Sequence, residues 1–143
     1  RLDIDTHGLL LLTNNGDLAH AMLSPKKHVD KIYRVKVDGI MDQEDILAFE
    51  KGIKLKDHTC QPAKLEILSV DRATGTSLVQ ITIAEGRFHQ VKRMVAACGK
   101  EVTELQRLSM GPLSLPSDLE VGAWRRLTEE ELEALTVFGI PLA

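Results

Sequence analysis

The stretch from Glu85 to Met94, E-G-R-F-H-Q-V-K-R-M, holds the side chains of this sequence that are best suited to chemistry. As a helix that begins after Gly86 and ends near Gly99, it has one face that carries His89, Lys92 and Arg93. The opposite, apolar face consists of Val91, Met94, Val95 and Cys98. Cations beside the free N–H groups of a helix N-terminus favour a phosphate or carboxylate ligand. A solvated amphipathic helix is the alternative for this segment alone.

Two further segments carry groups that are useful in catalysis. The chain starts R-L-D-I-D-T-H-G-L-L-L-L-T-N, which places the carboxylates of Asp3 and Asp5 close to its beginning. Tyr33, the single tyrosine, lies in K-I-Y-R-V at residues 31–35, where alternation puts it on the side of Val35. By residue type alone, Asp3 is more often a surface carboxylate and Tyr33 a core residue.

In this order, the three segments resemble the RsuA/RluB/RluE/RluF family of ribosomal RNA pseudouridine synthases. In that family an R-L-D-x-x-[ST]-x-G-L-L-x-L-T-[ND] stretch carries the nucleophilic aspartate. The resemblance continues through Leu105-Gln106-Arg107 and through G-A-W-R-R-L-T at residues 122–128. His-Gln and Lys within the segment 85–94 are most similar to members that act on 16S rRNA, since members that act on the large subunit tend to have Asn-Arg and Arg there.

The resemblance implies a role for each matching residue. Asp3 takes the place of the catalytic aspartate, and Lys92 that of the cation that keeps this carboxylate ionised through a single-point salt bridge. Tyr33 would place its ring against the uracil, and Leu105 would pack under the base unless it is a plain core leucine. The candidate RNA contacts, each of which is otherwise an ordinary surface group, are Arg1, Arg34, Arg87, His89, Gln90 and Arg93.

The reaction that the family performs breaks an N–C glycosidic bond, rotates the base and rejoins it through carbon. A carboxylate can attack the ribose or remove its proton, and neither a metal nor an organic cofactor is required. The expected substrate is one uridine of 16S rRNA, uridine 516, in free RNA or in a small-subunit assembly particle. The alternatives are a 23S rRNA synthase of the same family, a non-catalytic RNA-binding module for ribosome assembly, and a phosphoesterase or glycosidase that uses Asp3 and His89.

Composition is compatible with a globular RNA-binding enzyme. The chain has 143 residues, of which 43% are hydrophobic and 27% charged, and its net charge of −3 argues mildly against nucleic acid. However, basic residues cluster at 26–36 and 87–107, and acidic residues at 42–50 and 129–133. Five scattered histidines and the cysteines at 60 and 98 indicate no metal site, and no signal peptide or apolar membrane segment is recognisable. We therefore expect a cytoplasmic, monomeric protein.

The order of elements predicts an α+β fold with a mixed, largely antiparallel sheet flanked by helices. Helices are expected from Asp17 to before Pro25, from Asp42 to Gly52, and after Thr128, which forms a capping box with Glu131. The buried side of the last helix is expected to consist of Leu132, Leu135 and Phe138. Strands are expected at 8–13, 32–37, 60–70, 77–84 and 102–108, with a hairpin at 74–76. From the resemblance, we expect residues 1–143 to be the C-terminal portion of a catalytic domain, truncated at its N-terminus and without the S4-like domain of the family.

Overall fold

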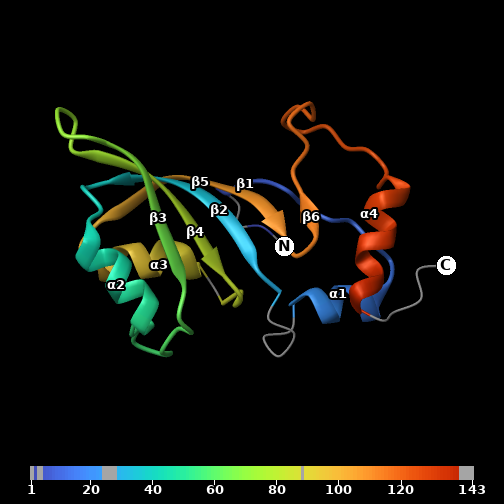
Figure 1. Ribbon diagram of the computed structural model, residues 1–143, viewed down its shortest axis with the longest axis horizontal. Coiled ribbons are helices and arrows are strands. Elements are labelled where there is room, and N and C mark those ends of the chain that lie inside the picture. Colours follow the sequence, from blue (N-terminus) through green and yellow to red (C-terminus); the bar gives the residue numbers. More distant parts are fainter. Residues whose placement is uncertain (1, 3–4, 24–28, 88, 139–143) are drawn as a thin grey trace.

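The computed structural model describes residues 2, 5–23, 29–87 and 89–138, and Figure 1 shows their arrangement. The elements are, in order, β1 (His7–Gly8), α1 (Gly16–Leu23), β2 (Lys31–Asp38), α2 (Gln43–Lys51), β3 (Lys64–Asp71), β4 (Thr76–Ile83), α3 (Gln90–Ala97), β5 (Glu101–Met110), β6 (Leu113–Ser114), α4 (Glu129–Ala134) and a 3₁₀ helix (Leu135–Phe138). None of the helices among these residues is long and apolar enough to cross a membrane.

The strands form one twisted sheet in the order β1-β5-β2-β4-β3, and β6 pairs with β5. All pairings are antiparallel except that of β1 with β5, which is parallel. The central pair, β2 and β4, is in continuous register from Lys31 opposite Ile83 to Asp38 opposite Thr76. The predicted α+β class, with a mixed and largely antiparallel sheet, is therefore confirmed.

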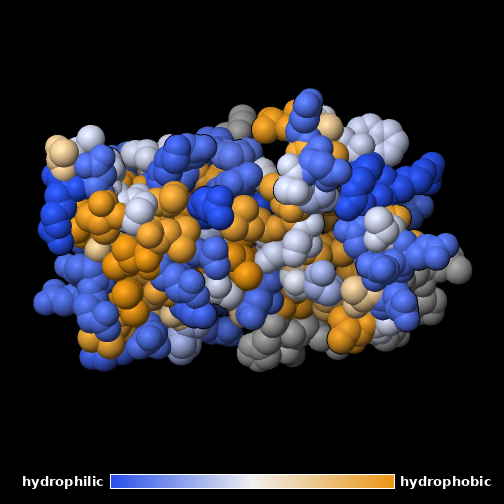
Figure 2. Space-filling model, turned by 45° about the horizontal axis from the view of Figure 1, so that its top comes forward, coloured by the Kyte–Doolittle hydropathy of each residue, from blue (hydrophilic) through white to orange (hydrophobic). Residues whose placement is uncertain are grey.

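Helices α2 and α3 cover the same face of the sheet (Figure 1). Strand alternation in β4 turns Val79, Ile81 and Ile83 toward them, and these side chains are almost fully buried with Phe49 of α2. A second, smaller core lies at the other end of the molecule, between α1, β6 and the 3₁₀ helix. It contains Leu18, Met22, Val29, Met110, Leu113 and Leu135. In Figure 2, apolar surface gathers over the half of the molecule that contains the sheet, whereas the half with α4 is more hydrophilic.

Local sequence signals explain the two helices that were best predicted. Asp42 caps α2 through a reciprocal capping box with Asp45, and Gly52 ends it with a positive φ of 96°. Thr128 and Glu131 form the predicted capping box of α4. α1 differs from the prediction, because it begins at Gly16, and the side chain of Asn15, not that of Asp17, caps it by accepting from the Leu18 N–H.

Three other expectations about the elements were wrong. The run of leucines after Gly8 is not a buried strand, since β1 ends at Gly8 and Leu12 is 80% exposed. β3 begins at Lys64 rather than residue 60, because the preceding segment folds back on α2, with the Ala63 N–H bound to the carbonyl of Phe49. Leu132 is half exposed, because the last helix is anchored in the smaller core by Leu135 instead.

Replacing Phe49 by alanine should lower the free energy of unfolding by about 3–5 kcal/mol, since its fully buried ring leaves a cavity between α2 and the sheet. Leu47 on the same helix is 45% exposed, so Leu47→Ala should cost no more than about 0.5 kcal/mol. Urea unfolding of both variants measures the difference. Equal losses would show that α2 does not pack as described.

Candidate active site

A cavity of about 460 Å³ lies between the polar face of α3 and the first half of β5. It is lined by Asp5, His89, Lys92, Arg93, Ala96, Glu101, Val102, Thr103, Glu104 and Leu105. The apolar face of α3 forces this arrangement, because Val91, Met94 and Val95 are buried against the sheet and the opposite face turns toward the cavity. The structure thus brings His89, Lys92 and Arg93 together, as predicted from their spacing, and places Leu105, which the resemblance assigned to the site, beside the same cavity.

α3 begins later than expected, at Gln90 instead of after Gly86. His89 precedes it with φ 49° and ψ 37°, the left-handed region, and among the described residues it is the one non-glycine with a positive φ. Such a conformation is uncommon for an L-residue and costs about 1–2 kcal/mol. It is supported by the Arg93 N–H, which donates to the His89 carbonyl. The strained residue therefore lies at the mouth of the cavity, where strain often accompanies function.

The ammonium of Lys92 forms an ion pair with Asp5. The salt bridge predicted for Lys92 was with Asp3, which lies outside the described residues together with Arg1. The hydrogen bond from Lys92 lowers the pKa of the Asp5 carboxyl, although this side chain is 65% exposed and solvent weakens the interaction. Lys92 therefore binds the segment that directly follows Asp3, through a carboxylate that the motif does not single out.

Tyr33 and Leu105 occupy neighbouring strands on the face covered by the helices. Tyr33 is partly buried against the main core and lies opposite Ile81 on β4 and Arg107 on β5. It is not among the residues that line the cavity. Leu105 is 4% exposed and belongs to the main core, yet it also lines the cavity. The core interpretation of Leu105 and the base-packing one are thus compatible.

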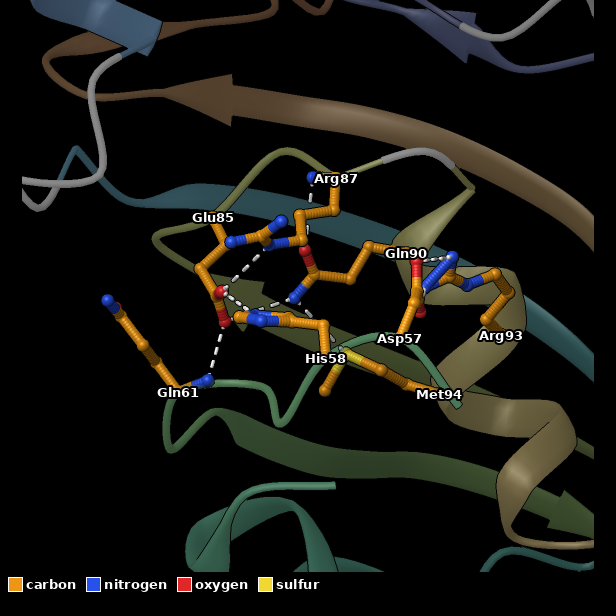
Figure 3. A network of polar contacts seen from close by, with 8 residues as sticks. All are labelled: Asp57, His58, Gln61, Glu85, Arg87, Gln90, Arg93 and Met94. Carbon is orange, nitrogen blue, oxygen red and sulfur yellow. Dashed lines mark hydrogen bonds and ion pairs between the residues drawn. The ribbon is translucent and has the colours of Figure 1, made fainter. Parts of the chain in front are cut away.

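A network of polar contacts fixes the segment before α3 and includes two of the predicted RNA contacts (Figure 3). Gln90 is 4% exposed, and its amide accepts from the Arg87 N–H at 3.1 Å and donates to Glu85 at 3.3 Å. The prediction that Gln90 contacts RNA therefore conflicts with its burial. Arg87, 56% exposed with its Nε 3.9 Å from Glu85, remains accessible.

Two other predicted contacts are placed differently. Both η nitrogens of Arg93 donate to Asp57, at 2.8 and 3.4 Å, so its guanidinium is already engaged by a carboxylate (Figure 3). Arg34 is exposed on β2, but strand alternation puts it on the face of the sheet opposite Tyr33. The structure does not bring Arg34 to the cavity, because adjacent residues of a strand point to opposite sides.

Glu85 is the centre of the network and is itself 4% exposed. Its carboxylate accepts from the Gln61 N–H at 2.5 Å, from the ring of His58 at 2.5 Å and from Gln90. Burial raises the pKa of this carboxyl, but the hydrogen bonds from Gln61, His58 and Gln90 outweigh burial, so that the pKa lies below its ordinary value. A buried carboxylate thus ties the loop at 57–61 to the start of α3.

His58, Cys60 and Glu85 also form a cluster of three groups that are typical zinc ligands, which the scattered histidines of the sequence did not predict. Their ligand atoms lie within 4.8 Å of one another. However, the His58 Nε2 and Glu85 Oε2 atoms are 2.5 Å apart, which is a direct hydrogen bond, and the other Glu85 oxygen accepts from Gln61. His58 and Glu85 are thus a hydrogen-bonded pair, and the Cys60 sulfur lies beside it.

The sequence pattern of the family described as RNA pseudouridylate synthase matches residues 1–97. The chain belongs to this family. Among curated relatives, it is 50% identical to the uncharacterized RNA pseudouridine synthase YtzG of Bacillus subtilis over 136 residues, and 45% identical over 135 residues to the ribosomal large subunit pseudouridine synthase B of the same organism. It is 43% identical over 138 residues to the ribosomal small subunit pseudouridine synthase A of Escherichia coli K12.

The matches cover 94% of this chain but 56%, 55% and 57% of the three relatives, so the chain spans just over half of their length. A solved structure described as a crystal structure of pseudouridylate synthase superposes with a TM-score of 0.85 at 43% identity, and covers 94% of this chain and 56% of that one. These comparisons confirm the family and the fold that the sequence motifs predicted.

The sequence pattern did not predict that two cations are buried near the candidate site. Lys31 and Arg107 are each 2% exposed, and burial, followed by the charge of Arg107, lowers the pKa of Lys31. A signal for them was present, since Lys31 stands two residues before Tyr33 and Arg107 two residues after Leu105. Strand alternation therefore places both cations on the same face as the candidate site.

The lowered pKa of Glu85 makes its contribution to stability depend on pH. Above the ordinary glutamate value of 4.5 the charged network stabilises the fold, and this contribution is lost as the pH falls through the lower pKa of the folded state. Glu85→Gln should therefore be clearly less stable than the parent in urea at pH 7, and the difference in the free energy of unfolding should shrink as the pH falls below 4.5. Glu120→Gln, at an exposed position, is the control. A gap independent of pH would contradict the assignment.

Proposed function

We propose that the protein is a pseudouridine synthase that isomerises a uridine of ribosomal RNA, with Asp3 as its catalytic carboxylate. The observation that carries the proposal is the cavity, in which Lys92 of α3 and Leu105 of β5 face each other while Lys92 binds Asp5, two residues after Asp3. The family match over residues 1–97 includes all of the segment that contains Asp3.

The proposed reaction breaks the bond between N1 of uracil and C1′ of the ribose, and forms a bond between C5 and C1′. Asp3 either attacks the ribose or removes a ribose proton in the first step. The base then rotates, and C5 bonds to C1′, which releases the Asp3 carboxylate or takes back the ribose proton that it removed. C5 then loses its hydrogen as a proton to solvent, and N1 takes up a proton, so that the product is an isomer of the substrate. Tyr33, on the strand beside Leu105, is the proposed ring against the extruded base, and Lys92 is the proposed source of the positive charge that keeps Asp3 ionised.

Arg1, Arg87 and His89 are proposed to contact the phosphates or base edges of the RNA around the target uridine. Support for Arg87 and His89 comes from the exposure of the first and the position of the second at the cavity. We keep Arg93 as a contact only if RNA displaces Asp57, and we withdraw Gln90 because it is buried. Arg34 would require RNA to reach the other face of the sheet.

We propose a 16S rRNA substrate, with uridine 516 as the target, acted on in the cytoplasm as free RNA or as an assembly particle. The residues His89, Gln90 and Lys92 support this choice, because they are most similar to those of family members that act on 16S rRNA. Overall identity does not decide it, because the large-subunit relative at 45% and the small-subunit relative at 43% are almost equally similar. A 23S rRNA target is therefore the second candidate. Sequence-specific chemical mapping of pseudouridine in both rRNAs, after incubation with the protein, distinguishes them.

Asp3→Asn should abolish the release of tritium from 5-tritiated uridine in rRNA, because the amide neither attacks the ribose nor accepts its proton. The expected loss exceeds about 10³-fold, since the amide removes the reacting group itself. Asp38→Asn, an exposed carboxylate at the end of β2, serves as the control and should release tritium at the parental rate. Parental release by Asp3→Asn would exclude catalysis by Asp3 and favour a non-catalytic RNA-binding role.

Lys92→Met should move the acidic limb of the pH–rate profile to higher pH, because the removal of a cation raises the pKa of a neighbouring carboxylate. Lys92→Arg, which keeps the charge, should leave the limb close to its parental position. Because Lys92 also binds Asp5, the profile is compared with that of Asp5→Asn, which removes this ion pair and keeps the cation. An unshifted limb in Lys92→Met would show that Lys92 does not act on the catalytic carboxylate.

A further inference from the structure

Arg107 is joined to the segment that follows Asp3 by both its main chain and its side chain. The Leu9 N–H donates to the Arg107 carbonyl at 2.9 Å, and the Arg107 Nε donates to the Leu9 carbonyl at 2.8 Å. Arg107 therefore both accepts from and donates to one residue of the neighbouring segment. Arg107 is 2% exposed, so water does not compete strongly for these bonds.

The contact is unusually close because the segment carries a glycine at this point. Gly8 pairs with Arg107 in the parallel β1–β5 register and has a φ of 112°, which L side chains rarely adopt. A Cβ built on Gly8 would lie 2.2 Å from the Arg107 carbonyl oxygen, a distance that requires the backbone to shift. The chain at residue 8 thus lies too close to the backbone of β5 to admit a side chain.

The same segment is held at two further points. Asp5 is bound by Lys92 of α3, and His7 lies 3.4 Å from Glu104 of β5. Three of the four side chains in these two contacts are more than a third exposed, so the contacts stabilise weakly, whereas the hydrogen bond from Arg107 to Leu9 is partly buried. Arg107 is therefore the strongest tie between β5, which contributes Leu105 to the cavity, and the chain that leads back to Asp3.

Burial of the Arg107 guanidinium costs desolvation free energy. Lys31 is buried nearby and its pKa is lowered in part by the charge of Arg107, so two cations share this interior. A methionine or leucine would fill the same volume without this repulsion, and comparable replacements of buried ions are often neutral or stabilising. The two hydrogen bonds with Leu9 give this cation a role in the placement of the segment that contains Leu9.

We propose that Arg107 is a positioning residue, which fixes residues 5–9 on β5 and thereby sets where the catalytic carboxylate of Asp3 meets the substrate. The inference rests on the proposed function. It assigns Arg107 no contact with RNA, because its guanidinium is buried and bound to Leu9. Loss of the contact should thus impair the chemical step and leave RNA binding largely intact.

The test compares Arg107→Lys and Arg107→Met with the parent in single-turnover tritium release and in equilibrium binding of the same rRNA fragment. A displacement of a catalytic group by about 1 Å costs on the order of 10²-fold in rate, so we expect a loss of about that size for Arg107→Met and a smaller one for Arg107→Lys. The Kd should change by less than about threefold, which is under 1 kcal/mol. Arg72→Met, an exposed arginine between β3 and β4, should behave like the parent.

A second measurement tests the contact without activity. Hydrogen exchange of the Leu9 amide should accelerate in both Arg107 variants and in Gly8→Ala, whereas amides in the β2–β4 pairing should keep their protection. If Arg107→Met does not fold, Arg107→Lys and Gly8→Ala carry the comparison. Parental turnover together with faster Leu9 exchange would overturn the inference, as would a parallel loss of binding and turnover. An inactive parent would instead refute the proposed function.

Discussion

The packing of α3 on the sheet is the constraint on which the candidate site depends. Three apolar side chains of this short helix are buried almost completely, so its rotation about its own axis is fixed to within one helical face. As a result, His89, Lys92 and Arg93 line the cavity together with the first half of β5. The burial of Val91, Met94 and Val95 thus turns the basic face of α3 toward the cavity. β5 supplies the facing wall, which contains Val102, Thr103 and Leu105 together with the carboxylates of Glu101 and Glu104.

Charged groups inside the protein are organised around this helix. Glu85 would be costly to bury alone, but four donors surround it, and three of them come from the loop at 57–61 and from Gln90. The same carboxylate therefore links α3, the turn before it and the loop after α2. Because Asp57 binds Arg93 from the same loop, the polar face of α3 is oriented by its neighbours before any substrate arrives.

The sequence predicted those parts that follow from local rules. The Asp42 and Thr128 caps, the alternation of β2 and the two faces of α3 each depend on residues within one or two turns of one another. Contacts over long sequence distances were not readable. The burial of Gln90 depends on Glu85 and on a loop thirty residues earlier, and Arg107 meets Leu9 across 98 positions. The prediction of a strand at 8–13 was wrong for the same reason. The apolar character of its leucines does not reveal that pairing with β5 stops at Leu9.

Because residue 92 is a lysine, the position of the segment that contains Asp3 and Asp5 has to be fixed by backbone contacts. An arginine holds a carboxylate through a rigid two-pronged fork, which fixes direction as well as distance, whereas an ammonium is a point charge with three rotatable donors. Lys92 can therefore supply positive charge to the segment that contains Asp3 and Asp5 without defining where a carboxylate must lie. Direction has to come from elsewhere, and the glycine-dependent pairing of residues 7–9 with β5 is the rigid element that the described structure offers next to it. Lys92 of α3 thus supplies the positive charge, and the pairing with β5 fixes the position of the segment that contains Asp3.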